Sequence, residues 1–132
     1  MRAILRAGFL LGTMLVLHGT SQELEARRQY ACSCWGVAEG YRFPLANPLC
    51  GSYNIATSFS SPFAVTCYNS CVSWAENAAP ASACQGTCGS YEWEGETYYW
   101  TPGSWYFDGY WEFNAPYPNY NWGNLTKSGS CG

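Results

Sequence analysis

Residues 91–122 read YEWEGETYYWTPGSWYFDGYWEFNAPYPNYNW, and roughly every second residue in this stretch is Tyr, Trp or Phe. Its clearest pattern is an alternation with a period of two. One set of alternating positions holds Trp105, Phe107, Trp111 and Phe113, and the set between them holds Tyr106, Asp108, Tyr110 and Glu112. This pattern predicts a β-strand with the first set buried and the second set on an amphipathic face.

The upstream run 91–94 alternates in the same way, and residues 101–104 (Thr-Pro-Gly-Ser) have the composition of a turn. Proline cannot adopt the positive φ that the tightest hairpin turns need, so a four-residue loop is expected. We therefore predict an aromatic hairpin over roughly 91–113. Its register would place Trp100 opposite Trp105, Tyr99 opposite Tyr106 and Tyr98 opposite Phe107.

This register has one conflict, because it places Glu94 opposite Trp111 on the buried face. A bulge at Gly95 or Gly109 would resolve the conflict by changing the direction of one strand. The proline-punctuated run 115–122 that follows is expected to be extended chain, outside any strand, with its rings laid over the sheet.

The rest of the chain predicts two more strands and one helix. A short strand is expected around 31–37, a disulfide-linked loop over 38–52 and a strand over 52–59 with Tyr53, Ile55 and Thr57 on one side. Ser60-Ser61-Pro62 is a typical helix start. Helical spacing then predicts a helix over about 63–78, ended by Pro80, with one further turn at 82–88. Its inner stripe would hold Cys67, Cys71, Trp74 and Ala78.

Eight cysteines in a chain of this size predict four disulfides and a small disulfide-rich α+β domain, made of an antiparallel sheet and one short helix. The cysteines are Cys32, Cys34, Cys50, Cys67, Cys71, Cys84, Cys88 and Cys131. Spacing alone permits many pairings. A Cys-x3-Cys pair on a helix points both sulfurs to one face, so we expect Cys67 and Cys71 to form bridges to Cys32 and Cys34. Cys32 and Cys34 are expected to supply only some of these partners. Cys131 should connect the C-terminus to the N-terminal half. A zinc site is disfavoured, and no metal or cofactor is expected.

The N-terminus has the features of a secretory signal peptide. Arg2 and Arg6 precede an apolar run too short to span a bilayer, and small residues follow up to Ser21. We expect a signal peptide over 1–21, a pro-segment over 22–28 that ends at the dibasic pair Arg27 and Arg28, and a single domain over 29–132. The protein is thus expected to be secreted without membrane insertion.

Removal of the first 28 residues leaves 104 (132 minus 28) and removes the only histidine, His18. The remaining basic residues, Arg42 and Lys127, face seven acidic ones, which gives a net charge of -5 (2 minus 7). This charge balance disfavours a nucleic-acid partner. The lack of histidine disfavours Ser-His-Asp, Cys-His and histidine acid-base catalysis.

Rings beside carboxylates suit sugar binding, because rings stack on apolar sugar faces and carboxylates accept hydroxyl hydrogen bonds. We expect the aromatic residues to exceed what the core can bury and predict a binding face made of Tyr99, Tyr106, Asp108, Tyr110 and Glu112. A carboxylate-dependent glycan hydrolase is an alternative, although Asp108 and Glu112 would be about 13 Å apart along one strand. Glu94 or Glu96 could approach Asp108 from an adjacent strand. A structural surface or matrix component is a third possibility.

The signal peptide, the dibasic pro-segment and the eight cysteines resemble fungal small secreted cysteine-rich proteins, including effector-like ones. The resemblance concerns the layout of the chain and implies a partner outside the cell, either an extracellular glycan or a host protein. Asn124-Leu125-Thr126 forms an N-glycosylation sequon, and a glycan at Asn124 is expected to face solvent.

Overall fold

The computed structural model describes residues 28–42 and 48–132. Its elements are, in chain order, β1 (Tyr30–Tyr41), β2 (Leu49–Ser61), α2 (Ala64–Ala83), β3 (Ser90–Trp93), β4 (Glu96–Tyr99), β5 (Ser104–Phe113) and β6 (Asn121–Ser130). The predicted signal peptide, nearly all of the predicted pro-segment and Arg27 lie outside the described residues. Arg28 is described and precedes β1.

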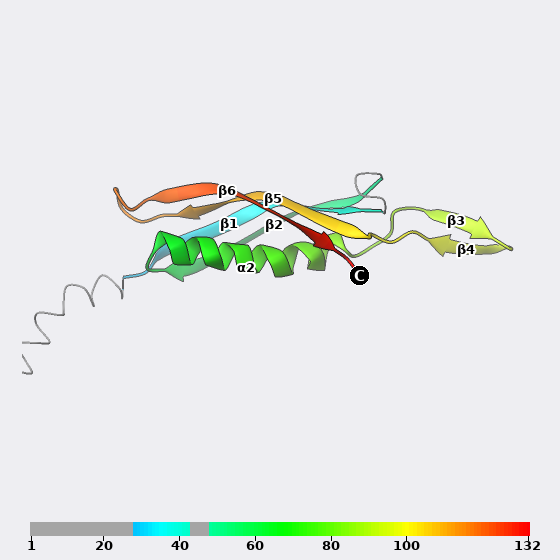
Figure 1. The fold of residues 1–132 in the computed structure, drawn as a ribbon, viewed down its shortest axis with the longest axis horizontal. Helices are drawn as coiled ribbons and strands as arrows, with labels where there is room; N and C mark the ends of the chain where they lie inside the picture. Colours follow the sequence, from blue (N-terminus) through cyan, green and yellow to red (C-terminus); the bar gives the residue numbers. More distant parts are fainter. Residues whose placement is uncertain (1–27, 43–47) are drawn as a thin grey trace, which may run out of the picture.

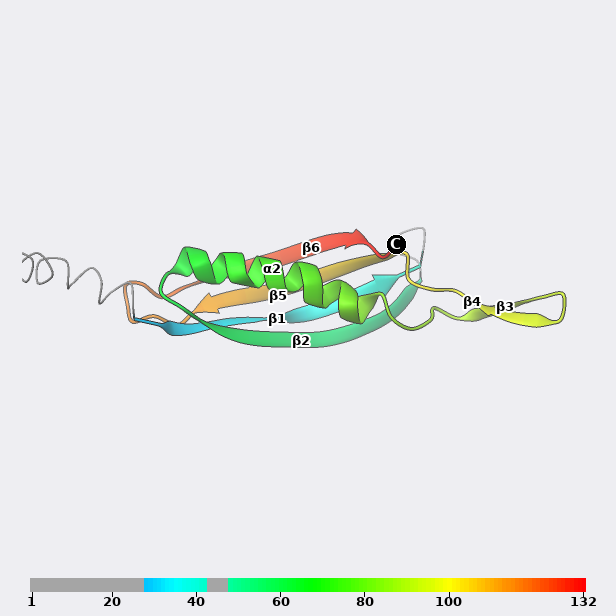
Figure 2. The same cartoon turned by 90° about the horizontal axis from the view of Figure 1, so that it is seen from below.

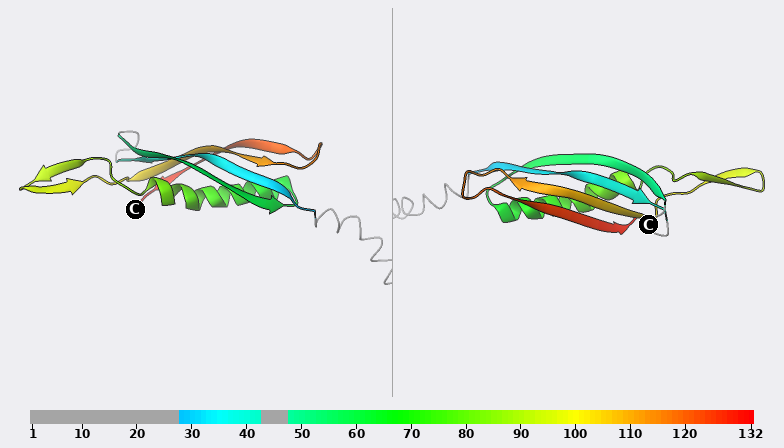
Figure 3. Two further views of the ribbon diagram at one scale, coloured as in Figure 1. Left: turned by 180° about the vertical axis from the view of Figure 1, so that it is seen from behind. Right: turned by 90° about the horizontal axis from the view of Figure 1, so that it is seen from above.

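Two layers form the body of the molecule. The first is a four-stranded antiparallel sheet with the order β2-β1-β5-β6, and the second is α2, which lies across one face of that sheet (Figures 1 and 2). No other helix or strand of the described residues covers the opposite face of the sheet (Figure 3). The predicted class, a small disulfide-rich α+β domain with an antiparallel sheet and one helix, is confirmed.

The core lies between α2 and β5. The four rings predicted to be buried on β5, namely Trp105, Phe107, Trp111 and Phe113, are all buried. Phe107 is fully buried and meets Trp74 of α2 edge-on, with ring centroids 5.7 Å apart. A Cβ atom on Gly36 or Gly109 would lie 2.7 or 2.6 Å from the tip of the Phe107 ring. Glycine at these two paired positions therefore makes room for the central ring of the core.

The two tryptophans of β5 explain why β6 can be a strand despite its composition. The register places Gly129 opposite Trp105 and Gly123 opposite Trp111. A Cβ atom on either glycine would lie 2.8 Å from the indole nitrogen of its partner. Each ring thus covers a glycine of the neighbouring strand and supplies the contact that the glycine lacks.

Four disulfides join the layers and the rim: Cys32–Cys67, Cys34–Cys71, Cys50–Cys88 and Cys84–Cys131. The pairing of the first two cysteines with the helical pair is confirmed. The expectation that Cys32 and Cys34 could supply these partners only in part is wrong, because residues two apart in a strand point to the same face and both cysteines form bridges. The expected bridge from Cys131 to the N-terminal half is wrong, since its partner is Cys84 at the end of α2.

The helix is longer than its sequence pattern predicts. It continues through Pro80 to Ala83, where Ala79 and Ala83 are buried against the sheet. The backbone N–H of Cys84 donates to the Pro80 carbonyl oxygen at 3.0 Å, so the last turn closes despite the proline. The predicted serine cap is absent, because the capping position is Phe63 in an extended conformation. The Ser61 hydroxyl instead bonds to the Phe63 carbonyl oxygen and the Thr66 hydroxyl.

The predicted hairpin over 91–113 is wrong. β3 pairs with β4 in a separate two-stranded sheet, whereas β5 pairs with β1 and β6. Glu94 and Gly95 both have positive φ, 51° and 81°, which is the geometry of a two-residue turn between β3 and β4. Gly95 therefore forms a turn, and Gly109 sits in a regular register, so neither marks the expected bulge. The small hairpin projects beyond the end of the main sheet (Figures 1 and 2).

Three further predictions differ from the structure in the bounds of strands or loops. The strands predicted over 31–37 and 52–59 exist but extend to Tyr30–Tyr41 and Leu49–Ser61, so most of the predicted loop over 38–52 is strand. Residues 43–47 of that loop lie outside the described residues. The predicted placement of Tyr53, Ile55 and Thr57 on one side of β2 is confirmed, because they pair with the alternating β1 positions 38, 36 and 34. Residues 121 and 122, expected to be outside any strand, begin β6.

Candidate functional site

The face of the four-stranded sheet opposite α2, called the outer face here, carries a row of rings across three adjacent strands. Tyr110 of β5 pairs with Trp35 of β1, and Trp122 of β6 stands beside Tyr110. The ring centroids of Trp35 and Tyr110 are 5.9 Å apart with an interplanar angle of 33°, and those of Tyr110 and Trp122 are 6.4 Å apart. We call Trp35, Tyr110 and Trp122 the aromatic row.

The aromatic row is open to solvent. The exposed fractions of Trp35, Tyr110 and Trp122 are 39%, 43% and 57%. One hollow beside the row is lined by Trp35, Tyr110, Glu112, Tyr120 and Trp122. A second hollow, on the other side of the Trp35–Tyr110 pair, includes Val37, Asn54, Ala56 and Asp108 in its lining. The two rings therefore form a ridge between two shallow depressions.

Carboxylates stand at both sides of the ridge. Glu112 lies next to Trp122 in the register, and Asp108 lies between Val37 and Thr126. The Tyr120 hydroxyl donates to Oε2 of Glu112 at 2.7 Å, and Nδ2 of Asn114 donates to Oε1 at 3.0 Å. The hydrogen bond to Glu112 raises the pKa of Tyr120 above its usual range. Glu112 is thus held in place by two side chains.

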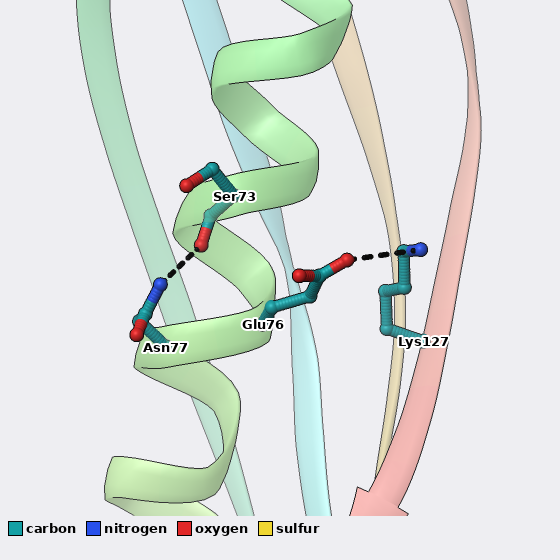
Figure 4. Close-up of polar contacts among 4 residues, drawn as sticks. All are labelled: Ser73, Glu76, Asn77 and Lys127. Atoms are coloured by element: carbon teal, nitrogen blue, oxygen red, sulfur yellow. Dashed lines mark hydrogen bonds and ion pairs between the residues drawn. The ribbon is translucent and has the colours of Figure 1, made fainter.

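The outer face is anionic because both basic residues of the predicted mature chain are engaged elsewhere. Nζ of Lys127 lies 3.2 Å from Oε1 of Glu76 on α2, on the covered side of the sheet (Figure 4). The Arg42 guanidinium lies 4.7 Å from the centre of the Trp100 ring, at the base of the small hairpin. Glu39, Asp108 and Glu112 therefore share the outer face of the described sheet, and neither Lys127 nor Arg42 lies among them.

The structure brings four of the five predicted binding residues together. Tyr106, Asp108, Tyr110 and Glu112 share the outer face of β5, as their alternation predicts. Tyr99 does not join them, because it belongs to β4 in the projecting hairpin. Sequence reasoning missed Trp35, Tyr120 and Trp122. Trp35 could have been found from the same alternation, since its neighbour Cys34 is buried.

The projecting hairpin carries a second group of rings. Tyr91 stacks on Tyr98 with centroids 5.5 Å apart and contacts Trp100 at a tilt, with centroids 4.8 Å apart. Trp93 and Tyr99 are more exposed, at 63% and 62%. Because Tyr91, Tyr98 and Trp100 contact one another, they stabilise the hairpin as well as present aromatic surface.

The positions of the carboxylates relative to Asp108 bear on the alternative of a glycan hydrolase. Glu94 and Glu96 lie in the small hairpin, and neither stands across from Asp108 in a shared sheet, contrary to one expectation. Glu39 is instead the diagonal neighbour of Asp108 across β1 and β5, a relation that typically separates Cα atoms by about 7–8 Å. The sulfurs of Cys32, Cys34 and Cys71 lie within 4.8 Å of one another because two disulfides are adjacent.

Comparison with protein-family models, curated proteins and solved structures finds no match to this chain. Within residues 28–42 and 48–132, no helix is both long and apolar enough to cross a membrane.

Proposed function

We propose that this chain is a secreted, non-enzymatic binding protein whose outer face binds an extracellular glycan. The observation that carries the proposal is the aromatic row, three solvent-open rings on adjacent strands. Four disulfides are typical of exported small domains, which supports secretion. The layout shared with fungal small secreted cysteine-rich proteins favours a ligand outside the cell.

The chemistry of the outer face fits a neutral sugar polymer. Ring faces contact the C–H faces of pyranose units, and hydroxyl groups donate to carboxylate oxygens. Asp108 and Glu112 flank the row on opposite sides of Tyr110, so both edges of a stacked sugar would find an acceptor. Lys127 and Arg42 lie away from this face of the described residues, which disfavours acidic glycans and nucleic acids.

The test is retention on insoluble chitin, cellulose and β-glucan. The wild-type protein should be retained on at least one, and Trp35→Ala should weaken retention about fivefold or more, since truncating a central aromatic side chain of a binding surface typically costs over 1 kcal/mol. Tyr99→Ala is the matched control, because it removes an exposed ring from the small hairpin instead. Loss of retention in Tyr99→Ala alone would contradict the assignment to the outer face.

An effector-like host protein partner is the alternative occupant of the same face. It predicts no retention of the wild-type protein on any of the three polymers, together with capture of a defined protein that Trp35→Ala abolishes. A structural surface or matrix role predicts self-association instead, which gel filtration at increasing concentration measures.

A second candidate, a carboxylate-dependent glycan hydrolase, is favoured by the diagonal placement of Asp108 and Glu39 on one face of two adjacent strands, because such an enzyme needs two carboxylates near each other. It predicts release of reducing ends from the retained polymer, and Asp108→Asn should abolish release while leaving retention in place. Retention without any release by the wild-type protein would exclude this activity on that polymer.

A further inference from the structure

The N-glycosylation sequon and the aromatic row occupy the same surface. Asn124 lies in the middle of β6, is exposed and stands directly opposite Tyr110 in the register. Residues directly opposite in an antiparallel pair have Cβ atoms about 4.5–5.5 Å apart and share one face. The Asn124 side chain therefore leaves the sheet next to the central ring of the row.

A second ring stands beside Asn124 along its own strand. Trp122 precedes Asn124 by two residues, so both side chains point to the outer face, about 7 Å apart along β6. Trp122 is the most exposed ring of the row, at 57%, and its centroid lies 6.4 Å from that of Tyr110. A sugar on Asn124 would thus have ring surface on two sides.

The remaining neighbours of Asn124 leave space for an attached sugar. β6 is the last strand of the sheet, so one flank of Asn124 has no neighbouring strand. Thr126, the hydroxyl residue that the sequon requires, is also exposed on the outer face. Glu112 and Asp108 stand across from Trp122 and Thr126, where they can accept hydrogen bonds from sugar hydroxyl or amide groups.

We propose that the first sugars of an N-glycan on Asn124 pack against Trp122 and Tyr110 and cover that end of the aromatic row. This inference rests on the secretion proposed above. It also makes glycosylation a control on the binding face, because a tethered sugar competes at high effective concentration with an external glycan. The Trp35 end of the row remains open in the glycosylated protein.

The test is a comparison of melting temperatures in protein secreted from a eukaryotic host. Glycan occupancy at Asn124 is confirmed by mass spectrometry, and Asn124→Gln supplies the protein without glycan. In the wild-type background the glycosylated form should melt about 2 °C or more above Asn124→Gln, since ring packing contributes about 0.5–1.5 kcal/mol. In a Trp122→Ala background this difference should fall below half.

Trp93→Ala is the matched control, because it removes a similarly exposed tryptophan from the small hairpin and should leave the full difference. Sugar ring protons of the glycosylated wild-type protein should also shift upfield in NMR spectra, and Trp122→Ala should remove that shift. An equal melting difference in all three backgrounds, or a secreted protein with no glycan on Asn124, would overturn the inference. None of these measurements uses an external ligand, so they are independent of the polymer retention test.

Discussion

Glu112 links the outer face, through side-chain hydrogen bonds, to the segment between β5 and β6. Its two carboxylate oxygens accept hydrogen bonds from Tyr120 and Asn114, which lie after β5 in the chain. A phenol that donates to a carboxylate resists deprotonation, and this bond is the main reason that the pKa of Tyr120 is raised. Burial is the first cause of the raised pKa of Tyr41, followed by the neighbouring Glu39.

These two shifts predict a loss of stability in alkali. A group whose pKa is higher in the folded protein stabilises the fold below its unfolded pKa, about 10 for tyrosine, and loses this contribution as the pH rises through the folded value. Glu112→Gln should therefore lower the titration midpoint of Tyr120, because the negative charge that opposes ionisation is removed. The measurement is the 295 nm absorbance titration of each protein minus that of its Tyr120→Phe counterpart. Identical midpoints in the wild-type protein and Glu112→Gln would contradict the role of this bond.

For single residues, the sequence predicts which side chains of β5 point to each face of the sheet. It does not predict which residues of the other strands join them in the candidate site. Alternation alone separates buried Phe107 from exposed Tyr110, because the period of a strand is two. Alternation along β1 places Trp35 on the side of its strand opposite Cys34, but only the pairing of β1 and β6 with β5 brings Trp35 and Trp122 beside Tyr110. The stretch that contains Trp122 is rich in Asn, Gly and Ser and carries no strand signal of its own.

Among the elements, the helix and four of the strands could be expected in outline, while the pairing partners could not. The incorrect hairpin arose because two aromatic runs flank a turn-like Thr-Pro-Gly-Ser segment. Glu94-Gly95, which is the actual turn, splits the first run into two short strands that pair with each other. The conflict of placing Glu94 opposite a buried tryptophan was the sequence signal that the register was incorrect.

The projecting hairpin of β3 and β4 should be removable without unfolding the body. Its strands are exposed along their whole length and, among the strands that the structure describes, pair with each other alone, while the Cys50–Cys88 disulfide holds the base. Replacing residues 90–99 with a short Gly-Ser linker should change the free energy of unfolding by less than about 1 kcal/mol. Urea denaturation followed by far-UV circular dichroism measures this change. A shortened protein that fails to form all four disulfides would show that the hairpin is needed for folding.

At the scale of the whole molecule, the disulfides fall into two kinds with different surroundings. Cys32–Cys67 and Cys34–Cys71 lie side by side in the core between β1 and α2, with sulfurs of the two bridges 3.7 Å apart. Cys50–Cys88 and Cys84–Cys131 secure the rim, where their cysteines are partly exposed. The first kind replaces aliphatic packing in a core that is otherwise built from a few rings and alanines.

Comparing one bridge of each kind separates packing from chain entropy. Cys34–Cys71 and Cys50–Cys88 close loops with sequence separations of 37 and 38, so the loop-closure contribution, about 4 kcal/mol in the entropic model, is the same for both. Cys34 and Cys71 are at most 1% exposed, so replacing both with alanine also leaves a cavity. Cys34→Ala/Cys71→Ala should therefore lose about 1–2 kcal/mol more free energy of unfolding than Cys50→Ala/Cys88→Ala. Urea denaturation measures both losses, after peptide mapping has confirmed the three remaining bridges. Equal losses would mean that the core bridge acts only as a crosslink, and its burial would then contribute nothing to the stability of the two-layer body.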